Sequence, residues 1–169
     1  AALDKVIAYN RLAVAEGAEV LLEGGPIEDG DLARGYFMSP FIYRMAANRG
    51  SRVLQEEVFG PHVAIIPCET IDEAIEIYND TGYGLAMGVI TNDYRAARRL
   101  REECEFGVGY VNLPTIGAEV QLPFGGLKKS GTGMPSAATL IDALTHRIAW
   151  TVNHSEEIQM AQGLGAGVT

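Results

Sequence analysis

The chain has 169 residues, enough for one domain with a real core, and its 47% hydrophobic and 21% charged residues are ordinary for a globular protein. Its net charge of −9 argues against nucleic acid and anionic membrane surfaces as partners. No apolar run of about 18 residues is present, so we expect no transmembrane helix, and the N-terminus lacks the pattern of a signal peptide. The chain starts without Met, and we expect a piece of a longer protein, although tag removal or N-terminal processing would look the same.

The first third of the chain predicts one helix and two extended segments. Apolar residues at helical spacing indicate a helix over 2–16, which Gly17 can end. A short strand is expected over 18–22. An acidic, glycine-containing loop over 27–34 separates it from an extended segment over 35–45.

The middle of the chain alternates short apolar strands with capped helices. Strands are predicted over 63–66, 85–90 and 108–111, with helices ending near 79 and 103. Thr70 and Glu73 form a capping box for the first helix, and residues 91–93 cap the second. This βαβαβ pattern over 63–111 predicts an α/β fold with a parallel sheet and flanking helices.

The C-terminal third predicts a glycine-rich loop over 125–133 and then a helix from Pro135 to Leu144. Alternating apolar residues over 147–153 predict a terminal strand.

No metal site is predicted. Cys68 and Cys104 lack metal-binding spacing, and we expect both to be reduced and structural, as in a cytoplasmic protein. His62, His146 and His154 are scattered and are interpreted as core or surface residues. The helix that ends near residue 103 carries a group of basic residues, which indicate a solvated face; they are Arg95, Arg98, Arg99 and Arg101.

Three motifs occur in a fixed order. They are Glu56-Glu57-Val58-Phe59-Gly60-Pro61, Tyr78-Asn79-Asp80-Thr81-Gly82-Tyr83-Gly84-Leu85 and Leu122-Pro123-Phe124-Gly125-Gly126-Leu127-Lys128-Lys129-Ser130-Gly131. Together they resemble the C-terminal part of an aldehyde dehydrogenase. The resemblance covers roughly 2–162. It implies a C-terminal portion of the catalytic domain over 1–146, an oligomerisation strand over 147–154 and a tail over 155–169. The resemblance also implies that strand 147–153 adds to a neighbouring subunit's sheet and has an exposed edge without it, so we expect a homo-oligomer.

The resemblance also implies what the chain lacks. The family's nucleophilic cysteine, activating glutamate and Rossmann domain all lie N-terminal to the matched part, so no catalytic residue is expected here. The parent enzyme would oxidise an aldehyde to a carboxylic acid through a cysteine thioester, with NAD or NADP as the acceptor. This chain alone would be inactive.

Glu57 and Phe59 are the predicted cofactor contacts. In extended chain they point to one side, and a carboxylate can hold two ribose hydroxyls while an aromatic ring packs against nicotinamide. The resemblance implies this role. The alternative from the residues alone is a surface turn with one buried Phe.

Three segments are predicted to contribute to substrate binding. Asn112 follows a strand at its carboxyl end, where α/β sites usually open. Phe124 matches the family's aromatic beside the aldehyde, with a core aromatic as the alternative. Gly117 and Ala118 resemble the loop that binds a distal carboxylate in semialdehyde dehydrogenases of the aminoadipate and ketoglutarate type, with a neutral loop as the alternative.

The glycine-rich loop differs from a phosphate-binding loop and, at its end, from the family pattern. The loop 126–133 does not have phosphate-loop spacing. Gly133-Met134-Pro135 replaces the family's Gly-Arg-Glu, which puts a proton-relay role there in doubt. Two rival hypotheses remain: a non-enzymatic truncated assembly module, and an aldehyde-forming reductase acting on an acyl phosphate. The Glu-x-Phe-Gly-Pro and Gly-Gly-x-Lys-x-Ser-Gly matches disfavour the reductase.

Overall fold

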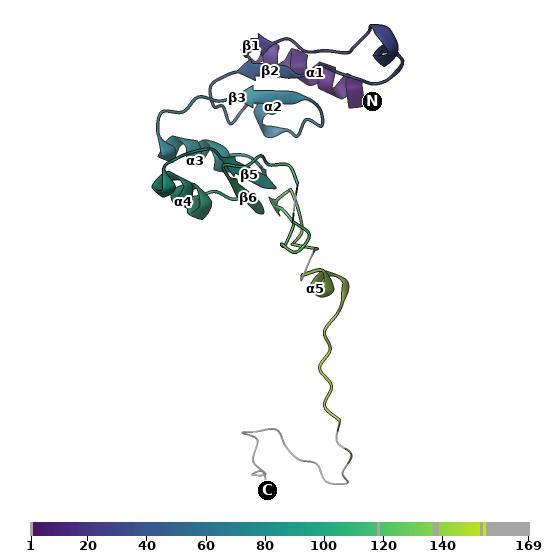
Figure 1. The fold of residues 1–169 in the computed structure, drawn as a ribbon, viewed down its shortest axis with the longest axis vertical. Helices are drawn as coiled ribbons and strands as arrows, with labels where there is room; N and C mark the ends of the chain where they lie inside the picture. The colour runs from purple at the N-terminus through teal and green to yellow at the C-terminus, as the bar shows by residue number, and fades with distance from the viewer. Residues whose placement is uncertain (1, 118, 137–138, 153, 155–169) are drawn as a thin grey trace.

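The computed structural model describes residues 2–117, 119–136, 139–152 and 154, and they form two α/β units followed by an extended segment (Figure 1). The first unit contains α1 (Ala2–Ala15), β1 (Glu19–Leu22), the 3-10 helix η1 (Gly30–Arg34), β2 (Phe41–Arg44), α2 (Arg52–Gln55) and β3 (His62–Ile65). Its sheet has the order β1-β2-β3, with β1 antiparallel and β3 parallel to β2.

The first core lies between α1 and this sheet. Val6, Tyr9 and Ala13 form a buried stripe on α1 at helical spacing. Tyr9 and Ala13 join Phe41 and Tyr43 of β2 in one hydrophobic cluster. Alternation along β2 explains this arrangement, because Phe41 and Tyr43 point to the same face of the strand.

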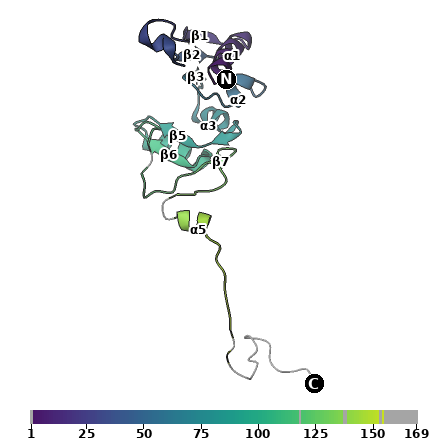
Figure 2. The same ribbon diagram turned by 90° about the vertical axis from the view of Figure 1, so that its right-hand side faces the viewer.

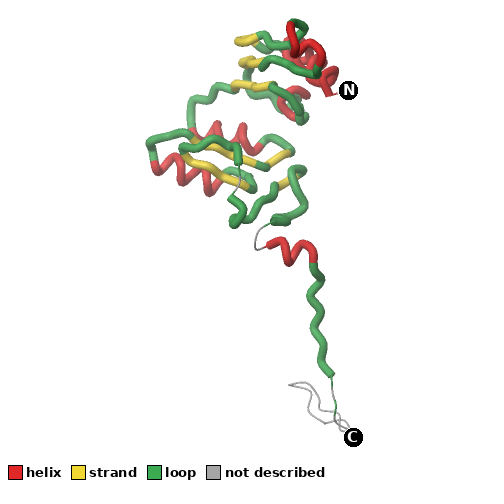
Figure 3. Tube along the Cα trace, turned by 45° about the vertical axis from the view of Figure 1, so that its right-hand side comes forward, coloured by secondary structure: helices red, strands yellow, loops and turns green. Residues whose placement is uncertain are grey.

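The second unit contains two layers and lies beside the first (Figure 2). Its elements are α3 (Ile71–Asn79), β4 (Tyr83–Gly84), β5 (Ala86–Val89), α4 (Tyr94–Glu103), β6 (Val108–Val111), β7 (Leu127–Lys128) and α5 (Leu140–Leu144). β5 pairs with β6 in parallel, and β4 pairs with β7 antiparallel. The buried residues Ile75, Met87, Val89 and Cys104 form its core. The loops after β6 lie between the β5–β6 pair and α5 (Figure 3).

The predicted starts of α3 and α4 are confirmed. The Thr70 hydroxyl accepts a hydrogen bond from the Glu73 amide at 3.1 Å. The Glu73 carboxylate accepts from the Glu69 amide at 2.8 Å, one residue before the amide that a standard capping box uses. Asp93 caps α4 by accepting from the Arg95 amide. The basic face of α4 is also confirmed as solvated, since Arg98 and Arg99 pair with acidic side chains at (i, i+4).

The predicted single parallel sheet over 63–111 is wrong. Within the described residues β3 pairs with β2, and β5 pairs with β6, so the strands belong to separate sheets. An apolar run predicts a buried strand, but it carries no information about which neighbour fills each hydrogen-bonding edge. The family-level class of mixed α/β structure is unaffected.

The predicted helix from Pro135 to Leu144 is too long, because among its described residues, which leave out 137–138, only Leu140–Leu144 is α-helical. The Thr139 hydroxyl donates to the carbonyl oxygens of Met134 and Ser136 instead. Such local bonds between a side chain and the backbone compete with helix formation, which explains the late start.

The predicted strand over 147–153 does not form over 147–152, and residue 153 lies outside the described residues, as does the tail 155–169. Its pairing with a second copy stays a prediction. Cys104 is buried as expected, but Cys68 is exposed, so the expectation that Cys68 is structural is wrong. Among the described helices, none has the length and apolar character needed to cross a bilayer.

Candidate functional site

Residues 56–60 follow α2 and are held against α1 by Glu56. The Arg52 guanidinium donates to both Glu56 carboxylate oxygens, at 2.7 and 3.2 Å, and the Tyr9 hydroxyl of α1 donates to one of them. These donors lower the pKa of Glu56 to about 2, with Arg52 as the larger cause. The Glu56 carboxylate is therefore charged at neutral pH and links α1 to α2.

Lys5 and Val6 fix the rest of this segment. The Lys5 ammonium donates to the carbonyl oxygen of Glu57 at 2.8 Å and lies 5.4 Å from the centre of the Tyr9 ring. A Cβ atom at Gly60 would collide with the Val6 side chain, so the Gly60 backbone packs directly on α1. The segment is thus held near both of its ends.

The side chains of Glu57 and Phe59 remain exposed. Phe59 is 73% exposed, and no described residue donates a hydrogen bond to the Glu57 carboxylate. The alternative of a buried Phe at position 59 is therefore wrong. An exposed carboxylate and an exposed ring on a fixed backbone fit a ligand that has both hydroxyl donors and a flat ring.

Asn112 ties together the carboxyl ends of β5 and β6. Its side-chain oxygen accepts from the Thr91 amide at 2.9 Å, and its side-chain nitrogen donates to the Thr91 carbonyl at 3.0 Å. Its φ of 56° places it in the left-handed region, which Asn tolerates better than most residues. Both ends of the carboxamide are used structurally in this chain, and a substrate contact by Asn112 stays a prediction.

The loop after β6 folds back over the β5–β6 pair. The Tyr110 hydroxyl donates to the Gly117 carbonyl oxygen. A Cβ at Gly88 would press on the Thr115 methyl group, so Thr115 packs close to β5. Gly117 has a φ of +92° and open space where a Cβ would lie, while Ala118 lies outside the described residues.

Phe124 precedes the glycine-rich loop and is 40% exposed. Its amide donates to the Ser136 hydroxyl at 3.0 Å. The loop itself approaches the strand region closely, because a Cβ at Gly107 would overlap the carbonyl of Gly125. Only glycine fits at position 107 without moving this loop.

Lys128 and Asn79, which belong to the sequence motifs, have structural partners that the sequence did not predict. The Lys128 ammonium donates to the carbonyls of Asn79 and Thr81 and pairs with Glu105 at 2.5 Å. The Asn79 side chain bonds to the Glu103 carbonyl and the Glu105 amide at the end of α4. Asn79 thus acts at the end of α4, whereas the sequence suggested the end of its own helix.

The predicted site residues fall into two groups. Glu57 and Phe59 belong to the first unit, whereas Asn112, Gly117 and Phe124 belong to the second. Among the described residues, no hydrogen bond or ion pair joins the two groups. Sequence reasoning missed Glu56, although its (i, i+4) spacing from Arg52 is a usable signal.

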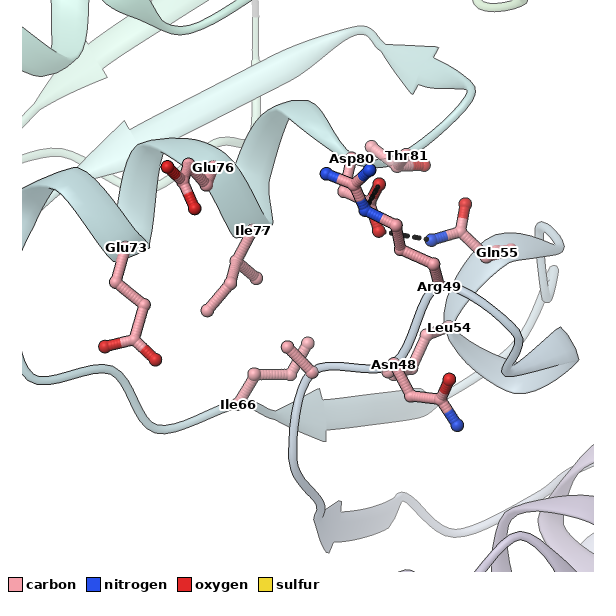
Figure 4. Close-up of a pocket in the computed structure, with 11 residues that line it drawn as sticks. Asn48, Arg49, Leu54, Gln55, Ile66, Glu73, Glu76, Ile77, Asp80 and Thr81 are labelled. Atoms are coloured by element: carbon pink, nitrogen blue, oxygen red, sulfur yellow. Dashed lines mark hydrogen bonds and ion pairs between the residues drawn. The ribbon is translucent and has the colours of Figure 1, made fainter.

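A hollow of about 290 Å³ lies where the two units meet (Figure 4). Arg49 pairs with Asp80 at 2.8 Å and Gln55 donates to Asp80 at 3.2 Å, so these bonds bridge the units beside the hollow. Its lining residues are Ala47, Asn48, Arg49, Leu54, Gln55, Ile66, Glu73, Glu76, Ile77, Asp80 and Thr81. None of the predicted site residues lines it.

His62, at the start of β3, links α1 to β2 in the first unit. Its Nδ1 lies 2.9 Å from the Asn10 side-chain oxygen, and its Nε2 lies 3.1 Å from the Tyr43 hydroxyl. A neutral ring that donates from Nδ1 and accepts at Nε2 satisfies both bonds. Burial lowers the pKa of His62, which favours the neutral form. His62 is half-buried and so lies between the two expected alternatives of a core and a surface residue.

Comparisons with known proteins agree with the sequence motifs. The family model described as "Aldehyde dehydrogenase family" matches residues 1–148. The chain is 38% identical over 130 residues to the alpha-ketoglutarate semialdehyde dehydrogenase of Haloferax volcanii, covering 77% of this chain and 27% of that protein. It is 40% identical over 142 residues to the 4-trimethylaminobutyraldehyde dehydrogenase of Rattus norvegicus, covering 83% of this chain and 28% of the relative.

A solved structure of the family has a similar fold. Aldehyde dehydrogenase C from Pseudomonas syringae, crystallised with NAD+ and octanal, matches with a TM-score of 0.71 and 32% identity. The match covers 81% of this chain and 27% of that one. The chain therefore spans little more than a quarter of the length of the proteins that it resembles.

Proposed function

Because this chain belongs to the aldehyde dehydrogenase family, we propose that it supplies the nicotinamide-side cofactor contact and part of the substrate wall of an NAD(P)-dependent enzyme that oxidises an aldehyde to a carboxylic acid. The observation that carries the proposal is the pair of exposed side chains, Glu57 and Phe59, on a backbone segment that α1 holds in place.

The free carboxylate and the exposed ring fit NAD or NADP. The Glu57 carboxylate can accept hydrogen bonds from two ribose hydroxyls, and the Phe59 ring can cover one face of a flat heterocycle. When bound, the cofactor accepts the hydride from the aldehyde carbon. The Pseudomonas syringae relative was crystallised with NAD+, which supports this class of cofactor.

The chemical step itself would belong to parts of the protein outside this chain. In the proposed reaction a cysteine thiolate adds to the aldehyde carbon, hydride leaves to the cofactor, and water hydrolyses the thioester to the acid and regenerates the thiol. We propose that this chain contributes no catalytic residue and is inactive alone. Two free cysteines without a disulfide fit a reducing compartment, and we propose a cytoplasmic location.

The substrate wall is proposed to contain Asn112, Gly117, Ala118 and Phe124. The positive φ and open surroundings of Gly117 suit a backbone that approaches an anion closely. By its name, the Haloferax volcanii relative acts on a carboxylated semialdehyde, which supports an anionic substrate. The rat relative, by its name, acts on an aldehyde with a trimethylammonium end, so a panel should compare both charges.

The single test is the KM for NAD+ of the natural polypeptide that contains this chain, compared with its Glu57→Gln variant. The substitution keeps the shape but removes the charge, and we expect KM to rise about tenfold. The melting temperature should not change, because no described residue bonds to the Glu57 carboxylate. Glu76→Gln, another exposed carboxylate, serves as the matched control. An unchanged KM for Glu57→Gln would reject the cofactor contact.

A non-enzymatic assembly module is the second candidate. It is favoured by the exposure of Ile148, Trp150 and Val152 after α5, which could form an edge strand with a second copy. The mass of the natural polypeptide in its source cells separates the two. A species of only about 169 residues supports the module, and a much longer one supports the enzyme.

A further inference from the structure

The Glu56 carboxylate is partly exposed but, unlike that of its neighbour Glu57, it is bonded to side chains of α1 and α2. Arg52 contributes two parallel hydrogen bonds from the same turn of chain, and Tyr9 contributes one from α1. Paired bonds between a guanidinium and a carboxylate fix both the distance and the plane of the carboxylate. Glu56 is therefore oriented from two directions at once.

Three residues of α1 contact this short segment. Tyr9 binds the Glu56 side chain, Lys5 binds the Glu57 carbonyl, and Val6 packs on the Gly60 backbone. Lys5 and Tyr9 are four residues apart and so lie on one face of the helix, with Val6 beside them. The main-chain position of Glu57 and Phe59 is thereby set by α1.

α1 itself cannot shift easily. Val6, Tyr9, Asn10 and Ala13 are buried, and Tyr9 and Ala13 belong to the core formed with β2. Because residues 56–60 are bonded to this helix, their backbone keeps its conformation although the side chains of Glu57 and Phe59 are exposed. Pre-organisation of this kind lowers the entropy cost of binding a ligand there.

We propose that Glu56 is a positioning residue for cofactor binding: with Arg52 and Tyr9 it holds the segment so that Glu57 and Phe59 present their side chains to the nicotinamide half. This inference rests on the proposed cofactor role of Glu57 and Phe59. Glu56 acts through its neighbours and touches no cofactor atom.

A double-mutant cycle in the complete natural polypeptide tests this proposal. Dissociation constants for NADH, measured by fluorescence titration, are compared for the parent protein, Glu56→Ala, Glu57→Ala and the double variant. We expect each single variant to weaken binding about tenfold. The double variant should bind more weakly than Glu57→Ala, because Phe59 also loses its support, but by clearly less than a further factor of about ten. Simple multiplication of the two effects would overturn the positioning role.

Two further variants separate positioning from general damage. Tyr9→Phe removes one donor and keeps the packed ring, so it should weaken NADH binding by a smaller factor than Glu56→Ala. Glu102→Ala breaks an equivalent (i, i+4) Arg–Glu pair on α4, and it should leave NADH binding unchanged. Equal weakening by Glu102→Ala would mean that the effect is not local.

The outcome also separates this proposal from the function on which it depends. If Glu57→Ala leaves NADH binding unchanged, the cofactor contact itself is wrong. If Glu57→Ala weakens binding while Glu56→Ala does not, the contact stands and the positioning role fails.

Discussion

The ammonium group of Lys128 lies 2.7 Å from the carbonyl oxygen of Asn79, the last residue of α3. A positive charge at this point satisfies a carbonyl that the helix leaves unpaired and interacts favourably with the helix dipole. The same ammonium bonds to Thr81 and Glu105, so one side chain joins the glycine-rich loop to the end of α3 and to the segment after α4.

Replacement of Lys128 by Met should destabilise this junction by about 1–3 kcal/mol, because two carbonyls lose a charged donor while the aliphatic stem is kept. Hydrogen–deuterium exchange of peptides that cover the end of α3 would report the change as faster exchange. Lys129→Met is the control, since among the described residues the Lys129 ammonium has one contact, with the Tyr83 ring at 5.9 Å. If the peptides at the end of α3 exchange as slowly in Lys128→Met as in the parent protein, the assigned role is wrong.

Asn112 offers a paired test of hydrogen bonding and backbone strain. Asn112→Ala loses both bonds to Thr91 and keeps a positive φ, so we expect a loss of about 2–4 kcal/mol. Asn112→Gly loses the same bonds but tolerates the positive φ, and it should be about 1 kcal/mol less destabilised. Thermal unfolding of both variants measures the difference. Identical losses would show that the backbone strain is unimportant.

His62 predicts a pH dependence of local stability. Its pKa is lowered in the folded chain, so the unfolded chain binds the proton more tightly. The stability that depends on neutral His62 is therefore complete above pH 6.5, the ordinary value, and falls as the pH drops below it toward the lower folded value.

The measurement for His62 is the exchange protection of β3 peptides at pH values between 7.5 and 5.5, corrected for the intrinsic rate. Protection should decrease on acidification in the parent protein. His62→Gln, which has no titrating ring, should show a flatter profile in the same window. A parallel decrease in both proteins would assign the effect to another group.

The segment 147–152 predicts an interface between copies. Trp150 is 81% exposed and alternates with the exposed side chains of Ile148 and Val152. Trp150→Asp should shift the natural polypeptide toward smaller species in sedimentation velocity, because a charge would be buried in the paired strand. Tyr36→Asp, at another highly exposed aromatic, should leave the distribution unchanged. Retention of the larger species in Trp150→Asp would exclude this interface.

Local signals in the sequence predicted most helices and strands of the fold. Thr70 and Asp93 start α3 and α4 as expected, because a cap depends only on residues a few positions away. The neighbours of β3 and β5 could not be predicted in the same way. Strand pairing depends on which distant edge is free, and a run such as residues 63–66 looks the same for any neighbour.

The candidate site shows the same division. The proposed roles require an exposed Glu57 and open space at Gly117, and both features are present. The supporting bonds were not predictable, because Tyr9 and Glu56 are 47 residues apart and only the fold brings them together. For Asn112 the sequence predicted a substrate contact but not the two hydrogen bonds that its side chain makes with the Thr91 backbone.

The separation of the two hydrophobic cores has an evolutionary consequence. Glu57 and Phe59 depend on the packing of α1, whereas Gly117 and Phe124 depend on the loops around β6 and β7. Substitutions in one core are distant from the other, and their effects should add rather than interact. Mutation around β6 would therefore alter the proposed substrate wall while a lineage inherits the first unit, and the coenzyme contact proposed there, unchanged.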